Sequence, residues 1–240
     1  MKHITLLSDK DFGKLNFLPF NRTYYVRNDL ISNMNKFGFT VPIILLSTDI
    51  IDGKFKYYVI DGQHRCATAQ YLNIPVEAVV FTQEETNITT LEDIVNFVSS
   101  MNSASKPWSL LNYVEAYNFL NYPEYHKLIT ITNSYPYTVN TVAMMLIGFR
   151  SGRGSSGSNI RVKEGKFKCN LYDETIYTLK LASKLSKHER LTSRMVLALH
   201  YVASLKSFDE EKFISMYKTK CKQLKELKLD DYTDVFSSWL

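Results

Sequence analysis

The sequence contains little cysteine and no long apolar run, and each absence argues against a class of protein. Cys66, Cys169 and Cys221 are isolated among 240 residues, and no CxxC pair occurs. A structural zinc site and a disulfide framework are therefore not expected. No window approaches the roughly 18 continuous apolar residues of a membrane helix. The apolar start of the chain is interrupted by charged residues from Asp9 onward, unlike a signal peptide. We expect a soluble protein of the reducing cytoplasm.

The composition is that of an ordinary globular protein, but its charge is unevenly distributed. Hydrophobic residues make up 45% and charged residues 22% of the chain, which is enough to build a core and argues against disorder. The net charge is +5; residues 1–110 hold 10 basic and 11 acidic residues, whereas residues 111–240 hold 19 and 13. Residues 150–168 contain six basic side chains and one acidic side chain. Such a cluster is typical either of a phosphate-facing surface or of a solvated loop.

The first part of the chain alternates between helix and strand patterns, which indicates an α+β unit. Asp52-Gly53 is a strong signal for a hairpin turn, and Gly38 and Asn73 are placed to end helices. In chain order, the expected elements are a helix over 29–37, strands over 41–46 and 55–60, a helix over 66–72 and a strand over 74–81.

From residue 89 onward the pattern is helical. Thr89 or Thr90 is expected to cap the first of these helices, with Glu92 or Asp93 completing a capping box. The Gly/Ser-rich stretch 151–158 is expected to be flexible. The expected helices cover residues 91–101, 109–120, a short segment from Pro123, 138–149, 173–185, 190–206 and 209–227, and a small hairpin is expected over 160–163 and 167–171.

The most informative segment is YYVIDGQHRCATA, residues 57–69, in which a strand leads through a polar turn into a helix. Gly62 allows a tight turn and a close approach to a ligand, and the amides of residues 63–66 would favour an anion at the helix start. Arg65 supplies a planar donor fork for phosphate, and Gln63 and His64 add donors. The alternative is an ordinary strand-to-helix turn whose arginine pairs with a nearby carboxylate.

Three segments, in this order, resemble the ParB/sulfiredoxin-like superfamily over residues 15–120. Pro19-Phe20-Asn21-Arg22 is similar to the first box of the family, and residues 38–43, GFTVPI, are similar to its G-x-x-x-P-I stretch. Residues 60–69, IDGQHRCATA, resemble the second box in a DGQHR variant.

The resemblance implies a nucleotide-binding core, because ParB proteins use CTP, while sulfiredoxin and kinase relatives use ATP. His64 stands where ParB proteins usually have arginine, and the acidic residue of the family's E-N-x-x-R stretch is missing before Asn102. Gln63 takes the place of the active cysteine of sulfiredoxin, so sulfinic-acid reduction is not expected. The nucleotide-binding residues implied are Asn21, Arg22, Gly62, Gln63, His64, Arg65, Asn102 and Lys106.

Two side chains near this motif have alternative roles. Asp61 lies beside the expected phosphates, where it could act as a catalytic residue or position a magnesium ion through an oxygen; the simpler interpretation is that it caps the following turn. Cys66 follows the arginine into the helix and is interpreted as a small core residue.

The second half is expected to contact DNA. Residues 125–149 are compatible with a helix-turn-helix whose second helix begins with the polar residues Thr138, Asn140 and Thr141. The basic segment after it would follow a phosphate backbone; the alternative is a plain helical domain with a cationic loop. Residues 173–240 are assigned to packing, with self-association as a homodimer left open. The DNA-binding residues expected are Arg150, Arg153, Arg161 and Lys163.

These patterns together predict a nucleotide-binding core over residues 1–105 and a helical domain over 106–240, with a DNA-binding part over 123–170. The first hypothesis is a ParB-like protein that binds CTP or ATP, with or without Mg²⁺, and DNA, encoded by a phage or a plasmid. The second is an enzyme with the same phosphate site, either a nuclease or an ATP-dependent kinase. The third is a scaffold that keeps the fold for protein contacts.

Overall fold

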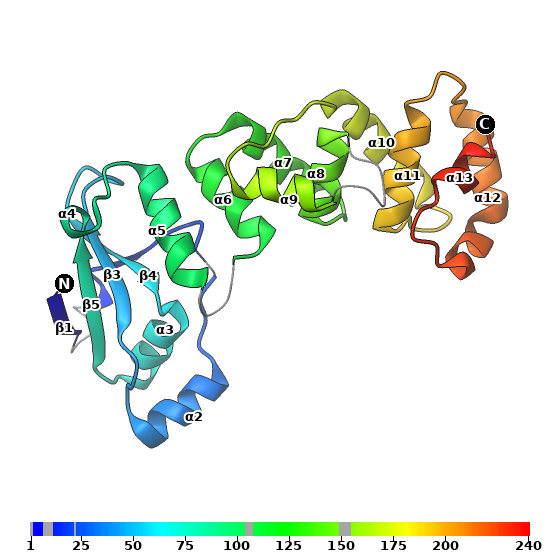
Figure 1. Ribbon diagram of the computed structural model, residues 1–240. Coiled ribbons are helices and arrows are strands. Elements are labelled where there is room, and N and C mark those ends of the chain that lie inside the picture. Colours follow the sequence, from blue (N-terminus) through cyan, green and yellow to red (C-terminus); the bar gives the residue numbers. More distant parts are fainter. Residues whose placement is uncertain (1, 7–11, 22, 104–107, 149–154) are drawn as a thin grey trace. The chain divides into compact units, whose positions relative to one another are not determined.

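The computed structural model describes residues 2–6, 12–21, 23–103, 108–148 and 155–240. The chain divides into two compact units, residues 1–120 and 121–240 (Figure 1). The division follows helix α6 (Leu110–Phe119), whereas the sequence placed it after residue 105. Trp108 and Ala116 are buried in the core of the first unit together with Phe20, and this burial joins α6 to that unit.

The first unit is built on a five-stranded sheet. The strands have the order β1-β5-β3-β4-β2. Strands β3 and β4 form the expected antiparallel hairpin, and Gly53 in its turn has a φ of 68°. Strand β5 runs parallel to β3 and strand β2 parallel to β4. The strands are β1 (Lys2–Leu6), β2 (Leu15–Phe17), β3 (Ile43–Thr48), β4 (Lys56–Asp61) and β5 (Val76–Thr82).

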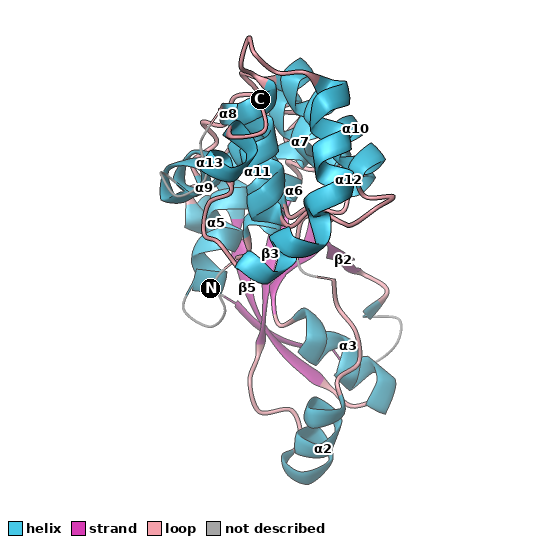
Figure 2. Ribbon diagram, turned by 90° about the vertical axis from the view of Figure 1, so that its right-hand side faces the viewer, coloured by secondary structure: helices cyan, strands magenta, loops and turns pink. Residues whose placement is uncertain are grey.

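Helices cover both faces of this sheet (Figure 2). Because side chains alternate along a strand, Val59 packs in the same cluster as Cys66 and Ala69 of α3. Its neighbours Tyr58 and Ile60 pack instead with α5 and α6. The helices of this unit are α2 (Asn28–Phe37), α3 (Gln63–Leu72), α4 (Gln83–Thr86), α5 (Leu91–Ser103) and α6 (Leu110–Phe119).

Several helix ends follow local sequence signals. Gly38 ends α2 with a φ of 71°, and Asn73 ends α3 in the left-handed region. The Asp93 carboxylate accepts the Thr90 N–H at 2.9 Å, and the Thr90 hydroxyl accepts the Asp93 N–H at 3.1 Å. The capping box expected before α5 is thereby confirmed.

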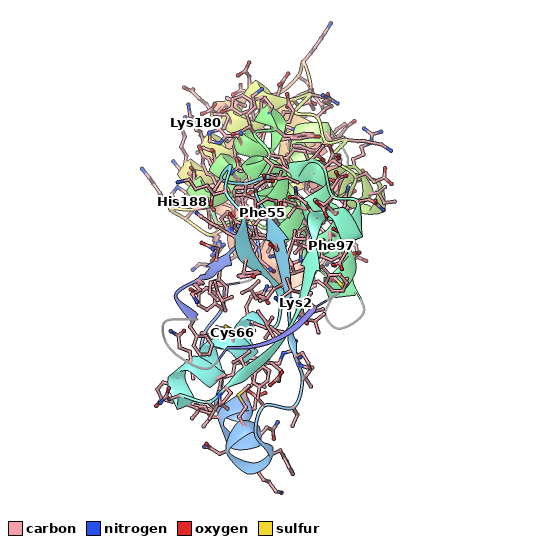
Figure 3. All side chains as sticks on the ribbon, turned by 90° about the vertical axis from the view of Figure 1, so that its left-hand side faces the viewer. Lys2, Phe55, Cys66, Phe97, Lys180 and His188 are labelled. Carbon is pink, nitrogen blue, oxygen red and sulfur yellow. The ribbon has the colours of Figure 1, made fainter. Side chains whose placement is uncertain are left out.

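Cys66 lies on α3 and is buried, as expected of a core residue (Figure 3). Burial raises the pKa of its thiol to about 11, which leaves it a weak nucleophile at neutral pH. On the opposite face of the sheet, Phe97 of α5 packs edge-to-face against Phe81 with their ring centroids 5.8 Å apart.

The described part of the second unit is helical. Pro123 is the first residue of α7, as expected. The short helix α13 was not foreseen. None of the described helices in either unit has the length and hydropathy needed to span a bilayer. The helices are α7 (Pro123–Ser134), α8 (Val139–Ile147), α9 (Ser155–Lys163), α10 (Tyr172–Leu185), α11 (Ser193–Ala203), α12 (Glu210–Leu227) and α13 (Thr233–Ser237).

The expected small hairpin is wrong, because residues 155–163 form helix α9 and residues 166–169 form no strand. Ser158 and Val162 are both fully buried, and at a spacing of four residues they share one face of the helix. The buried face contains a small polar residue, so the segment shows no helical hydrophobic period. Of the stretch expected to be flexible, residues 151–154 lie outside the described residues and residues 155–158 belong to α9.

Candidate functional site

The sequence motif forms a turn of residues 61–65 between β4 and α3, referred to below as the 61–65 turn. Gly62 is the N-cap of α3, with φ 91° and ψ 20°. This left-handed conformation is strained for a residue with a side chain. A Cβ atom at Gly62 would lie 2.7 Å from Ile43 Cγ2 and 2.9 Å from an Arg65 guanidinium nitrogen. Both the conformation and the lack of space therefore require glycine.

The N-terminus of α3 has no side-chain cap. Gly62 cannot supply one, no acidic residue lies in the first turn, and among the described residues no side chain accepts a cap hydrogen bond there. The Cys66 N–H makes the first helical bond, to the Gly62 carbonyl at 2.8 Å. The amides of residues 63–65 precede that bond, so they are the donors that a helix leaves without an intrahelical acceptor. Together with the helix dipole, such donors favour an anion.

Arg65 folds back across this turn. Its Nη2 lies 2.9 Å from Asp61 Oδ2, and both side chains are partly buried, with 22% and 30% exposure. The guanidinium occupies the space into which a Gly62 side chain would project. The structure therefore contains the arginine–carboxylate pair that the sequence left open as the simpler role. The pair also holds the guanidinium at the start of α3.

Asp61 is the residue expected to hold magnesium. Within the part of the chain that the structure describes, no group of three or more histidine, cysteine, aspartate or glutamate side chains could bind a metal ion. Any Mg²⁺ at Asp61 would therefore take most of its oxygen ligands from water or from phosphate, as Mg²⁺ commonly does.

Asn21 and Gln63 lie beneath the turn rather than at its surface. Asn21 Nδ2 donates to the carbonyls of Val59 and Ile60 at 3.3 and 3.0 Å. Gln63 Nε2 donates to the Ile60 carbonyl at 3.3 Å. Both residues are buried. Their amide groups therefore fix the end of β4, and the contribution that the structure supports for them is to shape the turn.

His64 holds an extended segment along α3. The backbone N–H and carbonyl oxygen of Tyr25 both lie 3.2 Å from His64 Nδ1, and the two rings meet edge-to-face at 4.6 Å. One turn further along α3, the Thr68 hydroxyl accepts the Arg27 N–H at 3.4 Å. Residues 23–27 are exposed, so they form a strap beside the start of the helix.

A cavity of about 210 Å³ adjoins Gln63 and this strap. Sequence reasoning did not find its aromatic wall, which consists of Phe17 and Tyr24 with ring centroids 3.9 Å apart and an interplanar angle of 19°. Phe17 lies on β2, a three-residue strand with no recognisable sequence period, so no signal paired it with Tyr24. The remaining lining residues are Leu18, Pro19, Asn21, Thr23 and Gln63.

Of the six expected nucleotide-binding residues that the structure describes, five belong to the 61–65 turn or lie beneath it, and the sixth, Asn102, belongs to α5. Asn102 lies near the end of α5 with 1% exposure, and its Nδ2 donates to the Val98 carbonyl at 2.8 Å. This hydrogen bond keeps its amide within α5. Arg22 and Lys106 lie outside the described residues.

Helix α8 differs from the recognition helix that the sequence predicted. Residues 141–146 are all buried, and Thr141 bonds to the Thr138 hydroxyl at 2.9 Å. A recognition helix contacts base edges with residues near its N-terminus, and α8 is partly exposed only near its ends. The expectation that α8 enters a DNA groove stays a prediction, and the burial limits it to the start of the helix.

Two of the four expected DNA-contacting residues fall at the far end of the next helix, α9. Arg161 and Lys163 are exposed in the last turn of α9, on either side of buried Val162. The Tyr125 hydroxyl donates to the Val162 carbonyl at 2.8 Å and fastens this end of α9 to α7. Arg150 and Arg153 lie outside the described residues.

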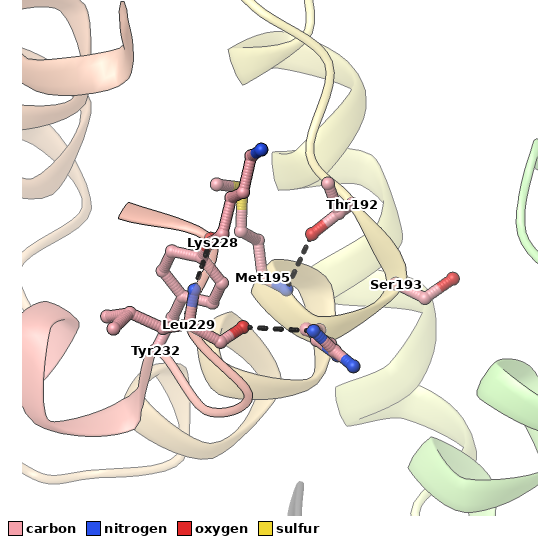
Figure 4. Close-up of a pocket in the computed structure, with 7 residues that line it drawn as sticks. Thr192, Ser193, Met195, Lys228, Leu229 and Tyr232 are labelled. Atoms are coloured by element: carbon pink, nitrogen blue, oxygen red, sulfur yellow. Dashed lines mark hydrogen bonds between the residues drawn. The ribbon is translucent and has the colours of Figure 1, made fainter. Parts of the chain in front are cut away.

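A larger cavity, of about 480 Å³, lies in the second unit at the start of α11 (Figure 4). The Thr192 hydroxyl caps the helix by accepting the Met195 N–H at 3.3 Å. Arg194 donates to the Leu229 carbonyl at 3.3 Å and pairs with Asp230 at 3.0 Å. These contacts fasten the loop after α12 to α11, and they assign the arginine a structural role.

Comparisons with known proteins were made by family model, by sequence and by structure. No family model matches the chain, and no curated protein matches it in sequence. Among solved structures, the chain is similar to the C-terminally truncated chromosome-partitioning protein ParB from Caulobacter crescentus, complexed with CTP-gamma-S. The likeness has 13% sequence identity and a TM-score of 0.33, and it covers 94% of this chain and 99% of that one.

Proposed function

We propose that this protein binds a nucleoside triphosphate, CTP or ATP, with its phosphates at the N-terminus of α3. The observation that carries the proposal is the uncapped start of α3, where Gly62 leaves room for the Arg65 guanidinium. Amide donors and a guanidinium fork at one helix start are a combination suited to phosphate. The motif resemblance to the ParB/sulfiredoxin-like superfamily points to the same ligand class.

Binding would proceed by exchange of partners. Arg65 is paired with Asp61, so a phosphate must compete with this carboxylate for the guanidinium. The pair is partly exposed, and such pairs contribute little net stability, so the exchange costs little. Asp61 would then be released to bind Mg²⁺ carried by the triphosphate.

A thermal-shift panel with CTP, ATP, GTP and UTP in the presence of magnesium tests the proposal. A ligand that binds only the native state at about 100 times its Kd adds about 2.7 kcal/mol of stability. Arg65→Ala should weaken binding by about 2–4 kcal/mol, roughly 30- to 1,000-fold, because a charge-assisted contact is lost. Arg27→Ala is the matched control, because this exposed arginine is also paired with an aspartate, Asp29.

A phosphate-release assay with the same nucleotides, read together with the thermal-shift panel, separates the alternatives that the sequence left open. Magnesium-dependent release of phosphate would favour an enzyme over a binding protein. If no nucleotide stabilises either the wild-type protein or Arg65→Ala, that result would contradict the proposal and leave a scaffold role.

We further propose that the second unit binds DNA through α9. Gly148 ends α8 in the left-handed region with a φ of 89°, and α9 packs against α8. The exposed side chains of α9 include Arg161, Lys163 and Ile160, which combine phosphate-binding cations with an apolar group of the kind that contacts thymine methyls. This assignment is an alternative to the start of α8 as the DNA-contacting segment. Salt-dependent binding of duplex DNA is the measurement that tests it.

A further inference from the structure

Two anchors to the 61–65 turn lie on either side of Tyr24, one at Asn21, before the strap of residues 23–27, and one at Tyr25, within it. At the first anchor, Asn21 is bonded to the carbonyls of Val59 and Ile60 at 3.3 and 3.0 Å. At the second anchor, the Tyr25 backbone lies 3.2 Å from His64 Nδ1. Both anchors restrict the movement of neighbouring residues relative to the start of α3. Tyr24 immediately precedes the second anchor, Tyr25.

Tyr24 is held in one orientation by stacking. Its ring lies nearly parallel to that of Phe17, with 3.9 Å between centroids, and 44% of the residue remains exposed. An exposed tyrosine loses rotamer freedom when it stacks, so Phe17 preorganises this ring as part of the cavity wall.

The cavity beside Tyr24 suits one planar ring and not a whole nucleotide. Its volume of about 210 Å³ is below the roughly 300–1,000 Å³ of sites that enclose a drug-sized ligand. Phe17, Leu18, Pro19 and Tyr24 supply apolar surface, whereas Thr23 and Gln63 supply polar groups. Apolar surface with a few polar groups matches a heteroaromatic ring, which has an apolar face and hydrogen-bonding edges.

The geometry points to Tyr24 as the residue that recognises the nucleobase: Phe17 covers one face of the Tyr24 ring, and the base would stack on the other face, beside the cavity that both rings line. This inference rests on the proposed function, because it places the base of the same nucleotide whose phosphates lie at α3. Gln63 both lines the cavity and begins α3, so a ring in the cavity adjoins the phosphate position.

Calorimetry with two kinds of ligand separates the base from the phosphates. CTP and ATP carry a base and phosphates, whereas inorganic tripolyphosphate carries phosphates alone. Tyr24→Leu should weaken nucleotide binding roughly 5- to 150-fold, the range for loss of one base–aromatic stack, and should change tripolyphosphate binding by less than about twofold. Tyr24→Phe keeps the ring and should bind like wild type. Tyr71→Leu is the control, because Tyr71 is an exposed tyrosine of α3 that does not line the cavity.

A second measurement uses the unaltered protein. In the complex, ring currents should move the proton resonances of the base upfield, and magnetisation should transfer between those protons and the Tyr24 ring. Nucleotide binding by Tyr24→Leu at wild-type affinity, or equal losses of nucleotide and tripolyphosphate binding, would overturn the inference while Arg65→Ala still tests the phosphate site. Failure of wild type to bind either ligand would instead overturn the proposed function, and the base assignment with it.

Discussion

Asp61 Oδ2 accepts a hydrogen bond from Arg65 Nη2 at 2.9 Å across Gly62, the residue that lets the guanidinium lie against the backbone. One carboxylate therefore competes with any phosphate for the arginine of the 61–65 turn. The same carboxylate is the candidate magnesium ligand, so its removal has opposite consequences with and without the metal.

Asp61→Asn is expected to raise nucleotide affinity in EDTA by about threefold to tenfold, because Arg65 loses a competing partner and the phosphates lose a repelling charge. With Mg²⁺ present, the same variant should lose the magnesium-dependent part of the affinity. Titration calorimetry under both conditions measures the two effects. Asp52→Asn is the control, because Asp52 forms a similar pair with Lys56, at 2.7 Å, in the hairpin. Weaker binding by Asp61→Asn in EDTA would show that the carboxylate assists rather than competes.

Gly62→Ala is expected to destabilise the protein by about 2–4 kcal/mol, since left-handed strain adds to a steric clash. The clash arises because a Cβ would lie 2.7 Å from Ile43 Cγ2. Gly53→Ala separates the two effects: Gly53 has a similar φ of 68°, but nothing lies within 4 Å of its Cβ position. It should therefore cost only the strain, about 1 kcal/mol. Urea unfolding measures both variants, and equal losses would show that the clash at Gly62 relaxes.

Local signals explain why the turn itself was predictable. The left-handed positions, the helix caps and the hairpin each depend on a few adjacent residues, such as Asp52-Gly53 or Thr90 with Asp93. The Arg65–Asp61 pair was also foreseeable as an alternative, because a tight turn at Gly62 brings the two side chains on either side of it close together.

The elements and contacts that the sequence did not predict depend on contacts between segments far apart in the chain. Strand β2 has three residues and exists by pairing with β4, about forty positions away, so neither it nor the Phe17–Tyr24 stack had a local pattern. Helix α9 was hidden because buried Ser158 interrupts its apolar face. The burial of α8 likewise comes from its packing among α7, α9, α10 and α11, which its own sequence does not encode.

The stability of the second unit should fall in weak acid through His200. The buried ring of His200 lies between α10 and α8, with Nδ1 3.0 Å from the Thr178 hydroxyl and Nε2 3.1 Å from the Met145 carbonyl. Burial lowers the pKa of His200, although the nearby Glu174 carboxylate and the Met145 carbonyl oppose this shift. The folded state thus favours neutral imidazole, so the stabilisation is complete above the unfolded pKa of about 6.5 and is lost as the pH falls toward the folded value.

Urea unfolding between pH 8 and pH 5 measures this dependence, which reaches at most about 1.4 kcal/mol per pH unit for one proton. His200→Gln should reduce the loss of stability below pH 6.5, whereas His188→Gln, at an exposed position, should leave it unchanged. Identical pH profiles for wild type and His200→Gln would exclude His200 as the source.

Exchange of two cations on α9 for acids should change how salt affects DNA binding. Each phosphate contact releases counterions, so log affinity falls with log salt by about 0.9 per contact on duplex DNA. Arg161→Glu with Lys163→Glu should therefore lower the slope by about 1.8 and weaken binding at low salt. Lys180→Glu with Lys206→Glu makes the same change in net charge at other exposed positions, and this control should keep the wild-type slope. Gel shifts at several salt concentrations, with and without nucleotide, measure the slopes. Equal slopes for the two double variants would mean that α9 does not contact the DNA phosphates. If the wild-type protein binds no duplex at low salt, DNA is excluded as the partner of the second unit.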